Sequence, residues 1–206
     1  MPKLPPIKSK KEFLKRFQER PLSWSQLSSF EYDPEQWYSS YMLGIREPAN
    51  PAMEFGTLIG DAIGTDDNPV AGLDPVGTKE FRLTGHLDEI LMVGYADHYC
   101  PKTFHLEENK TSTNHKRWTK KKADEHGQLT MYALMLFLRD KVPPEKVTMS
   151  LNFIRANIGQ DFIYRLVEGD DMYEQFPTKR TTQQVVEFSA WIIEMVDKMY
   201  EYQRSR

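Results

Sequence analysis

The chain has 206 residues and a formal net charge of −3 at pH 7, with 39% hydrophobic and 28% charged residues. This composition excludes a disordered chain and suits one globular domain, residues 1–206, with a substantial core. The single cysteine excludes an internal disulfide and a four-cysteine metal site built from this chain alone. The near-neutral charge argues against a uniformly basic surface for nucleic acid, but it permits a local basic patch.

Neither a membrane nor export is indicated by the sequence. No apolar run reaches the length that crosses a membrane, and the opening MPKLPPIKSKKEF lacks the apolar centre of a signal peptide. We therefore expect a cytoplasmic protein without membrane contact. Residues 1–8, with three prolines and two lysines, are expected to form a loose arm before a short amphipathic helix over 9–20.

Local signals predict where the N-terminal helices begin and end. Ser9 and Ser23 are each followed three residues later by Glu or Gln, which is the spacing of a capping box. Pro34 is expected to break or restart the second helix, and Gly44 to end it. A linker over 45–52 follows.

Two glycines, Gly56 and Gly60, lie four residues apart in the apolar stretch 53–63. On a helix this spacing produces a smooth strip where another backbone can approach. The next segment, 64–77, is polar and rich in Gly, Pro and Asp, which predicts a long exposed loop.

The remainder of the chain alternates between strand and helix patterns. The order predicts an α/β or α+β fold, with a mixed central sheet of about five strands flanked by helices. Expected strands cover 79–84, 87–99, 103–110, 146–154 and 161–167; expected helices cover 121–139 and 182–203; a basic loop covers 112–122 and a polar connection covers 169–179.

One predicted hairpin places acids and a lysine on a largely apolar pair of strands. Asp97 lies on the first strand, and Glu108 and Lys110 share one face of the second. Such charges are costly to bury without a metal or a partner, although a solvated strand face would also accommodate them. Asp88 is the alternative first acid. We prefer Asp97 because its strand is more apolar and because its separation from Glu108 suits one tight hairpin.

Four segments occur in order between residues 22 and 132: LSWSQLSSFEYDPEQWY, FGTLIGDAI, GYADHY followed by HLEENKTS, and QLTMY. They resemble, in turn, the opening helix, the first motif, the acidic and (D/E)xK strands, and the Q-x-x-x-Y helix of the PD-(D/E)xK nuclease superfamily. The resemblance is greatest to its RecB-like branch of phage exonucleases and CRISPR adaptation nucleases. It implies a restriction-endonuclease-like core.

The resemblance implies a role for each residue that matches a motif. Asp97 and Glu108 would bind Mg²⁺ or Mn²⁺ with the backbone carbonyl of Asn109, since hard cations prefer oxygen ligands. Lys110 would orient the attacking water and offset charge on the phosphate. Gln128 and Tyr132, four apart on one helix, would lie beside the active site; a polar rim on a buried helix is the simpler alternative.

The chain departs from the family pattern at two points. Some relatives carry a histidine four residues after the first-motif glycine, where this chain has Gly60; the adjacent Asp61 is the candidate replacement as a metal ligand. Relatives with an iron–sulfur cluster need four cysteines, so no such cluster is expected here.

Cations surround an aromatic residue directly after the lysine strand. Cations neutralise phosphates and an aromatic ring stacks on bases, so the loop is a candidate DNA-binding segment, and a solvated charged loop is the alternative. The candidate residues are Lys116, Arg117, Trp118, Lys120 and Lys121, with Lys122 next to them.

Together these features predict a Mg²⁺- or Mn²⁺-dependent deoxyribonuclease. We expect an exonuclease on DNA ends or single strands, in recombination, repair or phage DNA processing, with a recombination or replication protein as a further partner. The alternatives are a nucleic-acid-binding module that keeps the fold without cutting, and an accessory subunit of a recombination complex.

Overall fold

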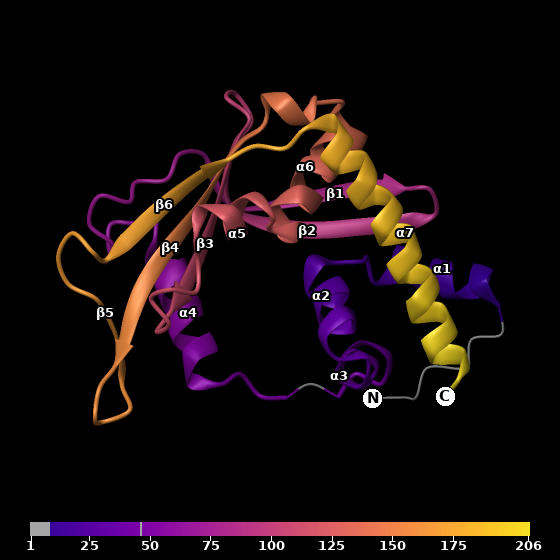
Figure 1. Ribbon diagram of the computed structural model, residues 1–206, viewed down its shortest axis with the longest axis horizontal. Helices are drawn as coiled ribbons and strands as arrows, with labels where there is room; N and C mark the ends of the chain where they lie inside the picture. The colour runs from indigo at the N-terminus through magenta and orange to yellow at the C-terminus, as the bar shows by residue number, and fades with distance from the viewer. Residues whose placement is uncertain (1–8, 46) are drawn as a thin grey trace.

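A computed structural model describes residues 9–45 and 47–206, so the expected N-terminal arm lies outside the described residues. Its centre is a mixed six-stranded sheet (Figure 1), in which β1 to β5 are neighbours in sequence order and β6 pairs with β4. β3 and β4 run parallel, and the other pairs are antiparallel. The predicted fold class is confirmed. The strands are β1 (Thr78–Leu87), β2 (Ile90–Cys100), β3 (His105–Ser112), β4 (Thr148–Ile158), β5 (Tyr164–Leu166) and β6 (Tyr173–Thr178).

Helices flank the sheet, as expected. The N-terminal helices lie below β2 in the view of Figure 1, where α1 contacts β2 and α2 contacts α7, and α4 lies beside β3. The α-helices are α1 (Lys10–Glu19), α2 (Trp24–Tyr32), α3 (Pro34–Trp37), α4 (Pro51–Ala62), α5 (Lys120–Asp124), α6 (Gly127–Asp140) and α7 (Thr182–Arg204); short π and 3₁₀ turns cover Tyr38–Met42 and Pro144–Lys146.

The predicted helix signals are largely confirmed. The Ser9 hydroxyl accepts from the Glu12 amide at 3.2 Å, which caps α1. Ser23 caps α2 in the same way. Gly44, expected to end the second helical segment, has φ 73°, the left-handed conformation that favours glycine after a helix. The linker over 45–52 is shorter than predicted, because α4 already begins at Pro51.

The single helix predicted over 121–139 is wrong: the structure has two helices, α5 and α6, with a break at residues 125–126. The buried guanidinium of Arg180 donates to the carbonyls of Ala123 and His126, at 3.0 and 3.2 Å, and so links the end of α5 to the break. At the start of α6, a Cβ on Gly127 would overlap the indole ring of Trp24. The break therefore depends on residues far away in the sequence.

Two other segments differ from the prediction. The polar connection over 169–179 contains an edge strand, β6, which raises the sheet from about five strands to six. Pro177 within β6 argues against a strand in the sequence, because proline cannot donate a hydrogen bond to a neighbouring strand, but proline is tolerated on an edge strand. β1 continues to Leu87, and the chain turns at Asp88, where φ is 51°.

Close packing fixes α6 against β1 and β2. A Cβ on Gly94 of β2 would overlap the ring of Tyr132, and one on Gly85 of β1 would lie 3.1 Å from the Cα of Met135. The two glycines therefore let α6 approach the sheet more closely than other residues would permit. This approach sets the position of the predicted Gln128–Tyr132 helix face over the hairpin.

The last helix, α7, packs against the N-terminal helices α1 and α2. Tyr200 packs against Phe13 of α1, with ring centroids 5.7 Å apart, and Tyr202 packs edge-on against Phe30 of α2 at 5.9 Å. One apolar stripe of α7 is buried against the core at Val185, Ile192 and Met199. Along the described part of the chain, no helix combines the length and apolar character needed to span a membrane.

Candidate active site

The candidate site lies where β2 and β3 separate. Their regular pairing runs from Cys100–His105 to His98–Glu107 and then stops. One residue further on, an oxygen of the Asp97 carboxylate accepts the backbone N–H of Asn109 at 2.5 Å. A side chain thus takes the place of a backbone acceptor, which holds the Asp97 carboxylate next to the backbone of β3 and close to Glu108.

A chain of hydrogen bonds fixes the predicted lysine. The Lys110 ammonium contacts Glu108 Oε1 at 2.6 Å and donates to Gln128 Oε1 at 2.9 Å. The Gln128 amide in turn donates to the Tyr132 hydroxyl at 2.6 Å, and that hydroxyl donates to the Tyr95 carbonyl at 2.6 Å. The structure therefore brings together Asp97, Glu108, Lys110, Gln128 and Tyr132 from β2, β3 and α6.

The carboxylates share an unfavourable environment. Burial raises the pKa of Asp97 to about 8, and the nearby charge of Glu108 adds to the effect. Glu108 is itself buried, and its Oε2 has no hydrogen-bond partner among the described residues. An unpaired buried oxygen of this kind is costly, and two crowded carboxylates favour a cation between them.

The pKa of Lys110 is also raised, but in a lysine this favours the charged form. Burial acts to lower its pKa, but the charge and hydrogen bond of Glu108 outweigh burial, and the pKa is raised above its ordinary value. The ammonium is therefore charged at neutral pH. Burial raises the pKa of Tyr132 as well, so its hydroxyl stays protonated as a donor. The lysine is held as a fixed positive charge beside the carboxylates.

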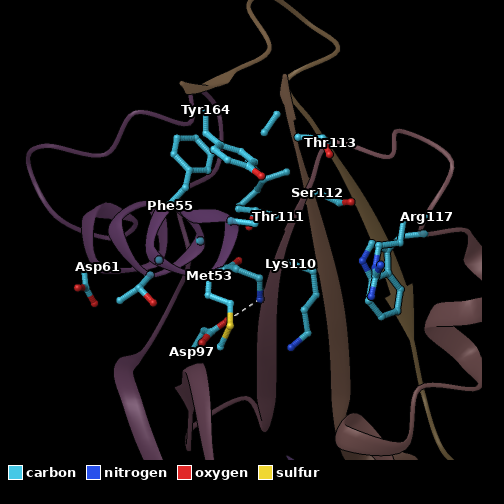
Figure 2. A pocket seen from close by; sticks show the side chains of 18 of the residues that line it. Met53, Phe55, Asp61, Asp97, Lys110, Thr111, Ser112, Thr113, Arg117 and Tyr164 are labelled. Atoms are coloured by element: carbon cyan, nitrogen blue, oxygen red, sulfur yellow. Dashed lines mark hydrogen bonds between the residues drawn. The ribbon is translucent and has the colours of Figure 1, made fainter. Parts of the chain in front are cut away.

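Asp97, Asn109 and Lys110 line a cavity of about 960 Å³ (Figure 2). One wall comes from α4, where Asp61 is exposed toward the cavity. A Cβ on Gly60, the position that differs from the resembled first motif, would meet no atom within 4 Å. The first-motif position therefore leaves open space where a side chain would fit.

The donor set suits a divalent cation in part. Asp97 and Glu108 could hold a hard cation through the oxygens that other groups leave free. Within residues 9–45 and 47–206, however, no three His, Cys, Asp or Glu side chains are grouped closely enough to hold a metal ion. The structure thus does not gather Asp61 with the two carboxylates as a third acid. Asp88, the alternative first acid, lies in the β1–β2 turn at the other end of β2.

The basic loop is only partly directed at the cavity. Arg117 and Trp118 line it. Lys120 forms an ion pair with Asp124, and Lys121 lies 3.8 Å from Glu125.

The remaining loop residues add little to the cavity wall. Lys122 donates to the Arg117 carbonyl at 2.6 Å, and the Lys116 side chain is exposed outside the cavity lining. Trp118 packs edge-on against His126, with centroids 4.9 Å apart, and against the core. The predicted cluster therefore places one cation and one half-buried ring at the cavity.

A third acid that sequence reasoning missed faces the same space. Glu80 of β1 falls between the β1–β2 pairs Lys79–His98 and Phe81–Ala96, which also flank Asp97. It lines the cavity and has φ 50°. A left-handed conformation in a non-glycine residue is uncommon, and such strain is concentrated at functional sites. The charge of Glu80 also contributes to the raised pKa of Asp97. No motif marks Glu80 in the sequence, since its position depends on strand pairing.

A buried polar network supports the site from behind. The Asn152 amide, fully buried on β4, donates to Glu107 Oε2 at 2.8 Å and to Asn109 Oδ1 at 3.0 Å. Gln175 of β6 donates to Asn152 Oδ1 at 3.0 Å. These bonds fix the side chain of Asn109, and therefore the strand that carries Glu108 and Lys110. The strand β6, missed in the sequence, contributes to this support.

Comparison of the structure with solved structures places this geometry in context. A candidate exonuclease from Eubacterium rectale superimposes with a TM-score of 0.56 and 13% identity over 98% of this chain and 88% of its own. The chain therefore has the fold of this exonuclease. A phage-related exonuclease from Haemophilus somnus 129PT gives a TM-score of 0.53 and 16% identity, over 97% of this chain and 88% of that one.

An alkaline exonuclease from Laribacter hongkongensis has the same fold, with a TM-score of 0.51 and 13% identity over 95% of this chain and 97% of its own. At these identities the likeness establishes the fold alone. No family model and no curated protein matches the sequence itself.

Proposed function

We propose that the protein is a Mg²⁺- or Mn²⁺-dependent deoxyribonuclease of the PD-(D/E)xK superfamily, RecB-like branch. We further propose that it acts as an exonuclease on DNA ends or single strands. The observation that carries the proposal is the fixed position of Lys110 between Glu108 and Gln128, beside Asp97. The exonuclease folds of the structural neighbours support it. A recombination or replication partner and a cytoplasmic location follow as expectations of the same proposal.

The cation would be held by Asp97, Glu108 and the Asn109 carbonyl, and would supply a more acidic water and stabilise charge on the phosphate. Lys110, held in place by Glu108 and Gln128, offsets negative charge as water attacks phosphorus. A new phosphorus–oxygen bond forms and the bond to the leaving sugar oxygen breaks, which yields a phosphate monoester and a free hydroxyl. The phosphate is steadied in the cavity by the guanidinium of Arg117.

A second candidate function is DNA binding without cleavage. The open space at Gly60 favours it, because no side chain occupies the first-motif position. In that case the site would bind phosphates through Lys110 and Arg117, and the carboxylates would have no catalytic role.

One experiment separates the two. The protein is incubated with labelled linear and circular DNA and Mg²⁺, Mn²⁺ or EDTA. We expect metal-dependent shortening of linear DNA that is lost in Glu108→Gln and Lys110→Ala. Glu89→Gln and Lys102→Ala, which change exposed residues of the β1–β2 and β2–β3 turns, serve as matched controls and should cut normally. Absence of cleavage with either metal, together with retained DNA binding in a gel shift, would replace the nuclease proposal with the binding module.

A further inference from the structure

A pair of aromatic rings closes the cavity at a distance from the basic loop. Phe55 of α4 and Tyr164 of β5 are stacked, with ring centroids 5.7 Å apart and planes inclined by 30°. Both residues line the same cavity as Asp97 and Lys110, and both are only half-buried. The two residues are more than a hundred positions apart in the chain, so no local sequence motif predicts that they meet.

The packing of the two rings is unequal. Phe55 packs against a small separate core that includes Ile59 of α4 and Ile63, the residue directly after α4. Tyr164 begins the short strand β5, where it pairs with Ile158 at the end of β4, and this hairpin carries its ring onto Phe55. Phe55 is thus held in place by this core, whereas Tyr164 packs against the Phe55 ring and lines the cavity.

The position of the rings relative to the charges suits a polynucleotide. In Figure 2 the pair lies on the far side of Thr111 from Asp97, and Lys110 and Arg117 also face the cavity. Close approach of α4 produces this arrangement, because a Cβ on Gly56 would lie 2.9 Å from the Thr111 hydroxyl. Charged groups that attract phosphate and rings that attract bases therefore lie in one cavity, on either side of β3 residue 111.

From this arrangement we infer that Phe55 and Tyr164 form a stacking subsite for a nucleobase of an unpaired DNA strand whose phosphate lies at Lys110. The inference rests on the proposed nuclease function and narrows its substrate. In a duplex the bases are stacked on one another and turned away from the protein, whereas an unpaired strand can present a base to aromatic rings. Every base has an aromatic face, so the subsite does not select sequence.

Binding without metal, in EDTA, tests the subsite independently of cleavage. Fluorescence anisotropy is measured for labelled single strands of mixed sequence and for a series in which one nucleotide at a time is abasic. Stacking of one base predicts that Tyr164→Ala weakens binding of the intact strand about tenfold. It also predicts that one abasic position weakens binding to the wild type by a similar factor, and that Tyr164→Ala adds nothing further with that strand. Tyr164→Phe should bind like the wild type.

The control and the contrary results are specific. Tyr32→Ala removes a tyrosine that is 89% exposed on α2, outside the cavity, and should leave binding unchanged. Unchanged binding in Tyr164→Ala, or an equal loss with intact strands and with every abasic strand, would overturn the subsite. Cleavage of DNA by the wild type with Mg²⁺, scored separately, shows whether the nuclease proposal stands when the subsite fails.

Discussion

Metal binding by this site should depend steeply on pH, because the cation and a proton compete for Asp97. The pKa of Asp97 in the metal-free protein is raised to about 8, so its carboxyl is mostly protonated at pH 6. If the cation binds the ionised form, the affinity falls tenfold for each pH unit well below the pKa. Between pH 8.5 and pH 6 the apparent Kd for Mg²⁺ should rise roughly 75-fold, as the ionised fraction drops.

Isothermal titration of Mg²⁺ into the protein measures both parts of this prediction. The affinity gives the pH dependence, and repeating the titration at pH 6 in buffers of different ionisation enthalpy counts the protons released, which should be about one per ion. Asp97→Asn should bind Mg²⁺ weakly with little pH dependence, while Asp88→Asn should match the wild type. A wild-type affinity that is constant from pH 6 to pH 8.5, without proton release, would refute this reasoning.

Further substitutions test the electrostatics, the packing and the DNA contact of the site. Asp97→Asn should raise the Tm of the metal-free protein at pH 7, because the raised pKa of Asp97 in the folded state lowers stability as pH rises from about 4 to 8. In thermal scans this gain in Tm should shrink toward pH 4. No gain in Tm at pH 7 would contradict the raised pKa of Asp97. Gly94→Ala should destabilise the fold by about 1–3 kcal/mol in urea titrations because its Cβ overlaps a ring. Gly60→Ala, in open space on a helix, should stabilise the fold by up to about 1 kcal/mol, and equal effects of the two changes would count against the packing argument. Arg117→Ala should reduce the salt dependence of DNA binding by about one phosphate contact, whereas Lys121→Ala, whose ammonium lies near Glu125, should change it little; the reverse order would place DNA on the basic helix instead.

The hairpin of the candidate site could be predicted because its information is local. Apolar strands, a turn and the spacing of Asp97, Glu108 and Lys110 all lie within one short stretch, and the structure forms that hairpin. Gln128 and Tyr132 could be placed on one helix face by their spacing alone. Their hydrogen bonds to Lys110 and Tyr95 could not, since these depend on how closely α6 approaches the sheet.

Other parts of the site depend on contacts between distant segments. Glu80 comes near Asp97 only through the pairing of β1 with β2, and Phe55 meets Tyr164 only after β5 folds back. At the break between α5 and α6, the carbonyls of Ala123 and His126 accept hydrogen bonds from the distant guanidinium of Arg180. The basic loop shows the opposite problem: its charges are evident in the sequence, but ion pairs with nearby acids, as at Lys120, direct several of them away from the cavity.

The packing of α7 has a consequence for the order in which the protein assembles. Phe13 and Phe30 emerge early during synthesis, yet the tyrosines that cover them, Tyr200 and Tyr202, are added only after the whole sheet. Contacts between such distant positions form slowly, because a long loop must first be closed. The helices α1 and α2 must therefore pass through a period with their apolar faces uncovered, and a nascent chain halted before α7 should be held by chaperones or lost to proteolysis.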